Sequence, residues 1–568
     1  MTVTTTHASC LILADLLEAH GVDCAVISPG SRNAPLIVAL ARHPAIETYH
    51  VIDERSAAFI ALGMSIRSGK PVALVCTSGT ALLNYAPAVA EAFYRRIPLI
   101  VVSADRPLEW IDQDDSQTLW QQDALAPYVK RSCDICNAAD NDNDRWFADR
   151  VINDCLLEAV NGRVGPVHIN IRLDAPLGKL SERMAEQPRV VSLTTPTPEL
   201  PTAEARRLGQ MLASPRKVMV IAGFHRPNTS LNRALSKLAR LPNVIVLTET
   251  VANLHSPEFI SRIDATLCRI TEEEREALRP DVVLTIGGAL ISRMIKAWIR
   301  EMPREVEHWH IGISHTTIDC FRHLTRRIEM EAPVFIRQLA SALQPHRAPS
   351  DYSTLWHKVA ERAAKEHVLK IARAPWSDLK AFASLFKSIP RGTDLQLSNG
   401  TPVRYAQLMD CSTLHSCECN RGVSGIDGCT STALGASVFS SGLTLLITGD
   451  MSMQYDISAL SSTLLSPRLK IIVIENGGGG IFRFIESTRN LDELEEYFVG
   501  SVRLPLRQLC EGYGLAYFEA ESEKSLERVL GRFFAENTRP ALLTVKTPGE
   551  VSAEVLLDYF SNHTGEGN

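Results

Sequence analysis

Short, continuous apolar runs separated by helix-like stretches recur along most of the chain. Up to about residue 180 the apolar runs lie at Cys24–Ile27, Pro71–Cys76, Pro98–Ser103 and Pro166–Ile171, and Leu11–His20 has a helical pattern. Continuous runs of this length predict buried strands, and buried strands that alternate with helices predict a parallel, doubly wound sheet.

The same alternation continues in two further blocks. Their strand-like runs lie at Lys217–Ala222, Val244–Leu247, Asp281–Ile286, Glu307–Ile311, Leu443–Thr448, Lys470–Ile474 and Pro540–Val545. Proline-rich stretches at 194–201 and 343–375 predict linkers, the second of them partly helical. We therefore expect an α/β chain with three doubly wound parallel-sheet domains, at residues 1–185, 200–345 and 376–555.

The first and last blocks share a local pattern. Thr77-Ser78-Gly79 and Thr448-Gly449 each follow an apolar strand, and a tyrosine, Tyr85 or Tyr455, lies six positions after each glycine. One interpretation is chance, because any two strand–turn–helix units look alike. The other is a duplicated architecture, with two related domains facing one another across a shared site. The pattern by itself leaves both open.

The composition narrows the class of protein. Of the 568 residues, 45% are hydrophobic and 22% are charged, which is typical of a globular protein. A net charge of −6 provides no basic field for nucleic acid, and no apolar run approaches the roughly 18 residues that span a bilayer. We therefore expect no nucleic-acid partner and no stable membrane insertion. The N-terminus lacks the charged region of a signal peptide, and 13 irregularly spaced cysteines favour a reducing cytoplasm.

Two candidate ligand residues lie directly after predicted strands of the last block. Asp450 and Asn476 each come directly after an apolar run, and glycines accompany both, in Gly449-Asp450 and Asn476-Gly477-Gly478. Because parallel strands end at the same edge of a sheet, a carboxylate and an amide oxygen are expected side by side. Mg²⁺ prefers such oxygens and leaves positions for phosphate. The pattern predicts a site for a divalent cation and a diphosphate, with glycines that permit close approach.

Two polar segments of the first block offer further candidates. Arg32 lies in the loop Ser28-Pro29-Gly30-Ser31-Arg32-Asn33, where a guanidinium and the N–H groups of a helix start can hold an anion. Glu54 precedes the apolar helix Ala57–Met64. Taken alone, Glu54 is more simply an ordinary first-turn glutamate favoured by the helix dipole.

Together these segments resemble a known family. Asp450 with Asn476-Gly477-Gly478 resembles the diphosphate and Mg²⁺ motif of thiamine diphosphate enzymes, in which a glutamate of an N-terminal α/β domain is the other hallmark. A narrower resemblance is to the 2-succinyl-5-enolpyruvyl-6-hydroxy-3-cyclohexene-1-carboxylate synthases of menaquinone biosynthesis, the MenD family. The motifs that carry it are 28–33, Asp53-Glu54-Arg55-Ser56-Ala57, Thr77-Ser78-Gly79-Thr80-Ala81, Ala104-Asp105-Arg106-Pro107, Asn420-Arg421-Gly422 and Ser424-Gly425-Ile426-Asp427-Gly428.

The resemblance implies a reaction and a place for it. Such enzymes use thiamine diphosphate with Mg²⁺ (or Mn²⁺) to decarboxylate 2-oxoglutarate, and they add the resulting succinyl carbanion in a conjugate manner to isochorismate. The cofactor lies between the N-terminal domain of one subunit and the C-terminal domain of its partner, so a homodimer or a dimer of dimers is expected. Glu54, the expected catalytic residue, would hydrogen-bond the aminopyrimidine ring and favour the tautomer that removes the thiazolium C2 proton.

The resemblance also implies the remaining site residues. Both substrates are dicarboxylates, and the planar fork of arginine binds a carboxylate bidentately. The expected cofactor-binding residues are Glu54, Thr77, Gly79, Ser424, Ile426, Gly449, Asp450, Met451, Ser452, Asn476, Gly478, Gly479 and Ile481, and the expected metal ligands are Asp450, Asn476 and Gly478. The expected substrate-binding residues are Ser31, Arg32, Arg106 and Gln117 for isochorismate, Arg404 and Arg421 for 2-oxoglutarate and its adduct, and Arg293, Ile481 and Phe482.

The chain also departs from the pattern of the family. Glu475 replaces a frequent asparagine and would add negative charge near the phosphates unless it points away. Gly400 stands where a serine often lies next to the substrate. Met294 stands where a second basic residue is expected beside Arg293, and Arg483 is a candidate for the missing charge.

Other interpretations compete with this one. The cluster Cys411, His415, Cys417, Cys419 and Cys429 lacks the paired spacing of a zinc ribbon, so free thiols are favoured. The middle block suggests a nucleotide fold but lacks G-x-G-x-x-G, so bound NAD or FAD is not expected. The functional alternatives are another thiamine diphosphate-dependent 2-oxoacid decarboxylase or carboligase, such as an acetohydroxyacid synthase, and a non-catalytic ligand-binding relative. The arginine set disfavours the first alternative, and the presence of Glu54, Asp450 and Asn476 together disfavours the second.

Overall fold

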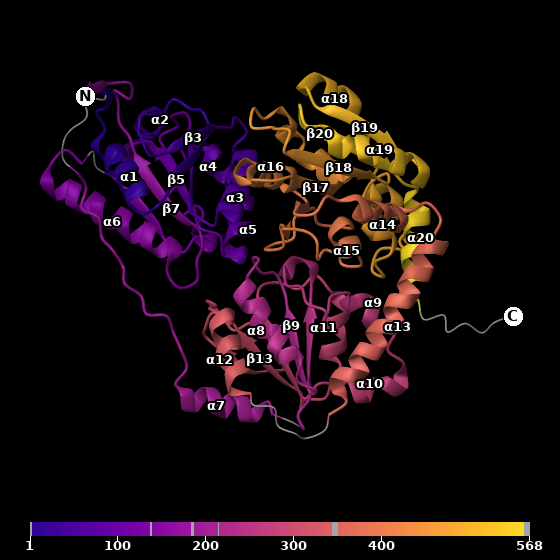
Figure 1. The fold of residues 1–568 in the computed structure, drawn as a ribbon. Helices are drawn as coiled ribbons and strands as arrows, with labels where there is room; N and C mark the ends of the chain where they lie inside the picture. Colours follow the sequence, from indigo (N-terminus) through magenta and orange to yellow (C-terminus); the bar gives the residue numbers. More distant parts are fainter. Residues whose placement is uncertain (1–2, 137–138, 183–186, 214, 344–349, 562–568) are drawn as a thin grey trace. The chain divides into compact units, whose positions relative to one another are not determined.

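A computed structural model of the chain describes residues 3–136, 139–182, 187–213, 215–343 and 350–561 (Figure 1). The expected domain limits at 185 and 345, and the linker residues Pro345 and Pro349, lie outside the described residues. The structure contains three six-stranded parallel sheets, and a small antiparallel pair of β1 (Val3–Thr5) and β8 (Leu180–Glu182). The predicted α/β fold with three parallel sheets is confirmed.

The first sheet has the strand order β3-β2-β4-β5-β7-β6. Its strands are β2 (Cys24–Ile27), β3 (Glu47–His50), β4 (Val72–Cys76), β5 (Leu99–Asp105), β6 (Ser132–Ile135) and β7 (Val167–Arg172). Its helices are α1 (Ala8–Ala19), α2 (Ala34–Ala41), α3 (Glu54–Ser68), α4 (Thr80–Asn84), α5 (Ala86–Arg95) and α6 (Asp142–Val160), with short turns η1 (Leu108–Trp110) and η2 (Ala126–Tyr128). The four predicted strands of this block are confirmed, because continuous apolar runs are fully buried here.

The last sheet has the order β16-β15-β17-β18-β20-β19. Its strands are β15 (Asp394–Leu397), β16 (Ser416–Cys419), β17 (Thr444–Gly449), β18 (Leu469–Glu475), β19 (Ala516–Ala520) and β20 (Ala541–Lys546). Its helices are α14 (Asp378–Ser388), α15 (Pro402–Ala406), α16 (Cys429–Phe439), α17 (Asp450–Tyr455), α18 (Leu506–Tyr513), α19 (Glu523–Ala535) and α20 (Gly549–Phe560), with η4 (Ile457–Ser461), η5 (Gly480–Arg483) and η6 (Leu494–Val499). When the strands of each sheet are renumbered along the chain, the first and last sheets both read 2-1-3-4-6-5. The first and last blocks therefore share one topology, which supports a duplicated architecture.

The middle sheet has a different order, β11-β10-β9-β12-β13-β14, which reads 3-2-1-4-5-6 in chain order. This is the order of dinucleotide-binding folds. Its strands are β9 (Val218–Ala222), β10 (Val244–Thr248), β11 (Phe259–Ile260), β12 (Val282–Ile286), β13 (Glu307–Ile311) and β14 (Leu324–Ile328). Its helices are α7 (Thr202–Met211), α8 (Thr229–Ala239), α9 (Ile263–Leu267), α10 (Glu272–Leu278), α11 (Arg293–Arg300), α12 (Ala332–Ala342) and α13 (Tyr352–Arg373), with η3 (Thr250–Ala252).

The loops at the switch point of the middle sheet are in direct contact. A Cβ atom added to Gly223 after β9 would lie only 2.3 Å from the carbonyl oxygen of Gly288 after β12. Ligands of such folds bind in the crevice at this point. In this chain the backbones of the two loops approach each other closely at that point.

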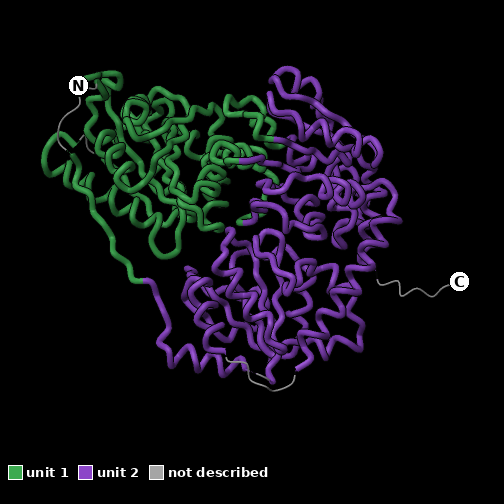
Figure 2. The backbone as a smooth tube through the Cα atoms, viewed as in Figure 1, with its two compact units in different colours: residues 1–196, 422–441, 455–469 green, residues 197–421, 442–454, 470–568 purple. Residues whose placement is uncertain are grey.

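The chain forms two compact units (Figure 2). Unit 1 contains residues 1–196, 422–441 and 455–469, and unit 2 contains residues 197–421, 442–454 and 470–568. Within unit 1, α16 packs closely on α3, because a Cβ atom on Gly63 or Gly435 would lie 2.0 Å from a backbone carbonyl oxygen of the other helix. This close approach joins a segment from the last block to the first sheet.

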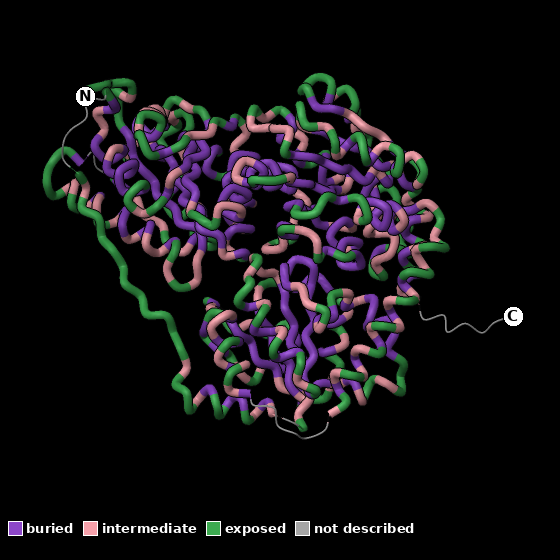
Figure 3. The backbone as a smooth tube through the Cα atoms, viewed as in Figure 1, coloured by how far each residue is buried: buried purple, intermediate pink, exposed green. Residues whose placement is uncertain are grey.

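The central strands of all three sheets are buried, whereas the edge strands β3 and β14 and many helices and loops carry exposed residues (Figure 3). Among the described residues, no helix combines the length and the apolar character that crossing a bilayer requires.

Candidate active site

Glu54 is the first residue of α3, in unit 1. The helix is capped by the neighbouring Asp53, whose Oδ1 accepts a hydrogen bond from the N–H of Ser56 at 3.2 Å. A second oxygen of Asp53 accepts a hydrogen bond from the hydroxyl of Ser458 at 2.8 Å. The half-buried Glu54 carboxylate makes no hydrogen bond or ion pair with any described residue. Since Asp53 provides the cap, Glu54 is available to accept a hydrogen bond from a ligand.

The loop after β4 carries Thr77 and Gly79. Thr77 is buried, and its Oγ1 has no hydrogen-bond partner among the described residues. The Gly30 loop lies directly on it, because a Cβ atom on Gly30 would come within 2.2 Å of the Thr77 Cβ. Gly79 has a φ of 85°, which favours glycine, and its N–H donates to Gln121 Oε1 at 2.7 Å.

The loop that carries Ser424 and Ile426 also belongs to unit 1. The fully buried carboxylate of Glu91 on α5 accepts hydrogen bonds from the two N–H groups at 422–423, at 2.7 and 2.8 Å. A buried carboxylate is stable there because backbone donors compensate its lost hydration. Glu91, which the sequence analysis did not select, therefore anchors the start of this loop, where Ser424 is exposed and Ile426 is half-buried.

Arg32 and Arg106 are the predicted substrate-binding arginines of unit 1. The Arg32 Nη1 donates to the carbonyl oxygen of Leu173 at 2.8 Å. Burial, and then the positive charge of Arg106, lower the pKa of Arg32. Arg106 itself forms an ion pair with Asp115. The neighbouring Ser31 is exposed. The two arginines therefore lie within electrostatic range of each other.

Asp450 begins α17, directly after β17 in unit 2. Its Oδ2 accepts hydrogen bonds from the N–H groups of Gly477 and Gly478 at 2.9 and 3.0 Å, and its Oδ1 accepts one from Met451 at 2.7 Å. Burial raises the pKa of Asp450 to about 6. The carboxylate thus fastens the glycine loop after β18 to the end of β17, and the two predicted motifs are brought together.

Asn476 is held by Asp378, a residue that no sequence motif indicated. Its Nδ2 donates to Oδ2 of Asp378 at 2.8 Å. Asp378 is almost fully buried at the start of α14, and its Oδ1 accepts hydrogen bonds from the hydroxyls of Thr547 and Ser552 at 2.5 and 3.2 Å. Because the amide nitrogen is taken by Asp378, the Asn476 Oδ1 is the atom left to bind a cation. No local pattern in the sequence distinguishes Asp378 from an ordinary first-turn aspartate.

The glycine loop is shaped by close backbone contacts. A Cβ atom on Gly478 would lie 2.3 Å from the carbonyl oxygens of Val499 and Gly500, and the N–H of Gly479 donates to Val499 at 2.7 Å. A Cβ atom on Gly449, in contrast, would meet no atom within 4 Å. The strand end beside Asp450 is therefore open to a bulky group.

Three further arginines gather in unit 2. Burial, then Arg293, then Arg421, lower the pKa of the largely buried Arg404 to about 10. Among the described residues, none of the three forms an ion pair, and the Nε atoms of Arg404 and Arg421 have no hydrogen-bond partner. Arg421 donates to Asn399 Oδ1 at 3.0 Å, and Asp264 is the acidic group that acts on Arg404. Unpaired guanidinium groups this close together favour binding of an anion.

The missing charge at Met294 has two candidate replacements. Arg483 is already engaged, because its Nε and Nη2 donate to Glu495 at 2.9 and 2.7 Å. Lys296, three positions after Arg293 on α11, is partly buried, and the charge of Arg421 contributes to lowering its pKa after burial itself. Lys296 thus lies within electrostatic range of the arginines, and its helical spacing from Arg293 was the overlooked signal.

The other predicted residues of unit 2 surround the same loops. Ser452 is buried and Met451 half-buried on α17, and Ile481 and Phe482 are half-buried in η5. The Phe482 ring lies 5.6 Å from the ring of Phe498. These apolar groups give one side of the loop a hydrophobic wall.

Two departures from the family pattern are resolved by their surroundings. Burial raises the pKa of Glu475, the charge of Lys546 on the adjacent strand β20 lowers it, and the charge of Glu519 on β19 raises it. Lys546 therefore offsets part of the negative charge of Glu475. Gly400 has a φ of 90°, where a serine would be strained.

The residues of the two units fit thiamine diphosphate with a divalent cation. In unit 2, the Asp450 carboxylate and the free Asn476 Oδ1 are hard oxygen ligands beside the open strand end at Gly449. In unit 1, the unpartnered Glu54 carboxylate and the orphaned Thr77 hydroxyl are suited to a nitrogen heterocycle.

Comparisons with known proteins identify the family. Residues 11–125 match the family model of the thiamine pyrophosphate enzyme N-terminal TPP binding domain. A 2-succinyl-5-enolpyruvyl-6-hydroxy-3-cyclohexene-1-carboxylate synthase from Porphyromonas gingivalis is 42% identical over 563 residues, which cover 98% of this chain and 97% of the relative. The chain belongs to the MenD family. Synthases of the same name from Flavobacterium johnsoniae and Bacteroides thetaiotaomicron are 36% and 34% identical, and each alignment covers 97% of this chain and 98% of the relative.

Membership in the MenD family confirms several predictions. The chain is a thiamine diphosphate-dependent enzyme, a transferase that forms a carbon–carbon bond in menaquinone biosynthesis. An acetohydroxyacid synthase and a non-catalytic relative, the two alternatives left open by the sequence, are set aside.

Proposed function

We propose that the chain decarboxylates 2-oxoglutarate and joins the remaining four-carbon unit, by conjugate addition, to isochorismate, with Mg²⁺ or Mn²⁺ as the metal. The observation that carries this proposal is the group of Arg293, Arg404 and Arg421, none of which has an ion-pair partner among the described residues. A dicarboxylic oxoacid needs such cations, whereas a small apolar oxoacid does not.

Each residue of the site has a proposed role. When bound, thiamine diphosphate would supply a thiazolium that accepts the electron pair left on the substrate carbon when CO₂ departs. Glu54 would hold a proton between its carboxylate oxygen and a nitrogen of the aminopyrimidine ring. Asp450, the Asn476 Oδ1 and the Gly478 carbonyl oxygen would hold the metal. The remaining cofactor contacts would come from Thr77, Gly79, Ser424, Ile426, Gly449, Met451, Ser452, Gly479 and Ile481.

The substrate carboxylates would be divided between the two sets of arginines. Arg404 and Arg421, assisted by Arg293, would hold 2-oxoglutarate. Ser31, Arg32, Arg106 and Gln117 would hold isochorismate, with Ile481 and Phe482 as the apolar wall. The guanidinium fork of arginine binds a carboxylate through two hydrogen bonds at once, so it also orients the substrate.

The assembly and the location follow from the same reasoning. We propose a homodimer or a dimer of dimers with active sites between subunits, in which residues 1–185 bind the pyrimidine, residues 376–555 bind the diphosphate and metal, and residues 200–345 form a central domain. The matching strand orders of the first and last sheets support two related halves. A cytoplasmic location is supported by the free state of all 13 cysteines.

One assay tests the proposed function. Purified protein with thiamine diphosphate and Mg²⁺ is given 2-oxoglutarate with and without isochorismate, and the loss of isochorismate absorbance is followed. We expect consumption of isochorismate only when both substrates are present. Absence of turnover, with pyruvate accepted in place of 2-oxoglutarate, would exclude the proposal.

A further inference from the structure

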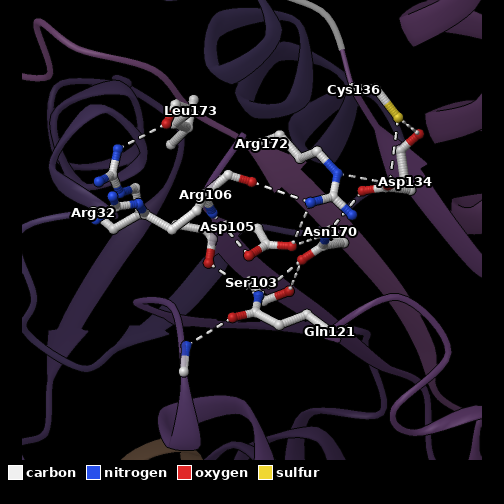
Figure 4. Close-up of polar contacts among 12 residues, drawn as sticks. Arg32, Ser103, Asp105, Arg106, Gln121, Asp134, Cys136, Asn170, Arg172 and Leu173 are labelled. Atoms are coloured by element: carbon white, nitrogen blue, oxygen red, sulfur yellow. Dashed lines mark hydrogen bonds and ion pairs between the residues drawn. The ribbon is translucent and has the colours of Figure 1, made fainter. Parts of the chain in front are cut away.

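A glutamine outside the predicted site connects three of its parts. Gln121 is fully buried, in the segment between β5 and η2. Its Oε1 accepts a hydrogen bond from the N–H of Gly79 at 2.7 Å. Its Nε2 donates to the carbonyl oxygen of Ala104 at 3.1 Å and to Asn170 Oδ1 at 3.0 Å (Figure 4). One side chain thus joins the loop after β4, the end of β5 and strand β7.

The orientation of this amide is unique. Its oxygen faces an N–H donor and its nitrogen faces two acceptors, so a rotation by 180° would break all three hydrogen bonds. Asn170 is equally determined, because its Oδ1 also accepts from Ser103 at 2.7 Å while its Nδ2 donates to Asp105 at 2.9 Å and Asp134 at 2.8 Å. Buried amides whose hydrogen bonds are all formed stabilise a single arrangement of the surrounding side chains. An arrangement that leaves one of these groups without a partner is strongly disfavoured.

The network ends at the backbone of Arg106. Asp105 Oδ1 accepts a hydrogen bond from the Arg106 N–H at 2.8 Å, and Arg172 Nη1 donates to the Arg106 carbonyl oxygen at 3.1 Å (Figure 4). Arg172 is held in turn by ion pairs with Asp105 at 3.1 Å and Asp134 at 2.9 Å. Both polar backbone groups of the substrate-binding arginine are therefore fixed by side chains of the buried network.

Gln121 also controls the segment that carries Gln117. Gln117 is exposed and has a φ of 55°, and its backbone lies over Gly79, because a Cβ atom there would be 3.5 Å from the Gln117 Cα. The hydrogen bond from Gly79 to Gln121 fastens this segment four residues later. Gln121 is therefore bonded directly to Gly79, follows Gln117 by four residues, and is connected to Arg106 through Asn170 and Asp105.

We propose that Gln121 is a positioning residue, which sets the spacing between the cofactor loop at Gly79 and the Arg106–Gln117 stretch that receives the second substrate. The proposal rests on the proposed function for the identity of that substrate. Gln121 acts through Gly79, Ala104 and Asn170, and it does not itself contact the reacting groups.

The test compares Gln121→Leu with Gln122→Leu, a matched variant of the exposed neighbouring glutamine. The measurements are the Kd of thiamine diphosphate with Mg²⁺ in the absence of substrates, the KM for each substrate, kcat and Tm. For Gln121→Leu we expect the cofactor Kd and the isochorismate KM to rise about tenfold or more, because Gly79, Ala104 and Asn170 each lose a buried hydrogen bond. The KM for the oxoacid substrate should stay within about twofold, and Gln122→Leu should match the parent. Equal changes in both KM values, or a lower Tm with unchanged Kd and KM, would overturn the proposal.

A second variant keeps the proposal testable if Gln121→Leu does not fold. Gln121→Glu retains the acceptor for Gly79 and loses the donor, except when its carboxyl group is protonated. At each pH, the isochorismate KM of this variant is divided by the KM of the parent at the same pH. We expect this ratio to fall toward one as the pH is lowered from about 8 to about 6. A pH-independent defect would contradict the proposal. The cofactor Kd needs no substrate, so failure of the proposed reaction and failure of the Gln121 proposal are distinguishable.

Discussion

The first and last sheets have the same strand order but opposite chemistry at corresponding turns. β4 and β17 occupy the same place in their sheets. After β4, the backbone N–H of Gly79 is held by a neutral amide oxygen of Gln121. After β17, the carboxylate of Asp450 holds the N–H groups of Gly477 and Gly478. The common topology gives both sheets a similar edge at the ends of β4 and β17. The carboxylate of Asp450 after β17 makes the edge of the last sheet the one that suits a cation.

The two sheets also differ in the strand next to the last edge strand. β7 reads Val-His-Ile-Asn-Ile-Arg, and His168 and Asn170 are fully buried within it. β20 reads Ala-Leu-Leu-Thr-Val-Lys and has leucine and threonine, Leu542 and Thr544, at the corresponding positions. The first sheet therefore has a buried histidine and a buried asparagine in this strand, whereas the last sheet has a leucine and a threonine there. Loss of a single hydrogen bond within this strand is therefore expected to cost more in the first sheet than in the last.

The strongest test of the contrast is Glu54→Gln. The neutral amide cannot hold a proton for the aminopyrimidine ring, so turnover should fall by about 10²–10⁴-fold while the cofactor Kd changes little. Turnover and cofactor binding are measured together, with Glu47→Gln, an exposed glutamate of the same sheet, as the control. Retained turnover would mean that Glu54 is only a first-turn residue of the helix.

Asp450→Asn, unlike Glu54→Gln, should weaken cofactor binding. Loss of the carboxylate removes a metal ligand and the acceptor of two N–H groups, so the affinity for thiamine diphosphate with Mg²⁺ should fall about 100-fold. Calorimetry at increasing Mg²⁺ concentration measures this affinity, and the exposed Asp492→Asn is the control. Normal cofactor binding by Asp450→Asn would contradict this difference between the two sheets. Loss of cofactor binding in Glu54→Gln would contradict it as well.

Asp378→Asn tests the orientation of the metal-binding amide. The variant removes the charged acceptor of Asn476 Nδ2, and the amide oxygen is no longer directed toward the cation. Mn²⁺ affinity, measured by electron paramagnetic resonance, should fall about 10- to 100-fold. Ser552→Ala removes the hydrogen bond of 3.2 Å to the same carboxylate and the acceptor of the Asp378 N–H at 2.9 Å, but it leaves the Asp378 charge and its contact with Asn476 in place, so it should have a smaller effect. An unchanged Mn²⁺ affinity would show that Asn476 is oriented by other contacts.

The pH dependence of stability should reveal the buried histidine of the first sheet. Burial lowers the pKa of His168 to about 4. Between about pH 4 and 6.5 the unfolded chain therefore binds more protons than the folded chain, and the free energy of unfolding should fall as the pH is lowered, by at most about 1.4 kcal/mol per pH unit from this group. Urea unfolding across this range should show a shallower slope for His168→Gln. The exposed His50→Gln should retain the slope of the parent, and an equal slope in both variants would contradict this assignment.

Arg483→Ala should have the smallest effect. Because Arg483 is engaged by Glu495, we expect the KM for one substrate to rise only about two- to threefold. Lys296→Ala should raise a KM more, about tenfold, since Lys296 lies in the field of Arg421. Steady-state kinetics with both substrates measures the difference. Unchanged kinetics in Arg483→Ala would remove any role for this arginine, and a larger effect than that of Lys296→Ala would restore it as the replacement cation.

The sequence predicted the parts of the fold that depend on local pattern. Continuous apolar runs identified buried strands such as β4 and β17, and glycine with a carboxylate after a strand identified Asp450 and Asn476. These signals are visible because hydrophobic periodicity and turn chemistry act over a few residues. The motifs around Glu54 and the arginines were specific enough to predict the family and its cofactor.

Only the tertiary structure decided which side chains hold these residues in place. Asp378 is 98 positions from Asn476, and Asn170 is 49 positions from Gln121, so neither contact has a local signature. The packing of α16 on α3, which places residues 422–441 in unit 1, likewise depends on Gly63 lying against the backbone of α16 and on Gly435 lying against the backbone of α3. A buried polar group is stable only with a partner, and the fold alone determines which distant residue becomes that partner.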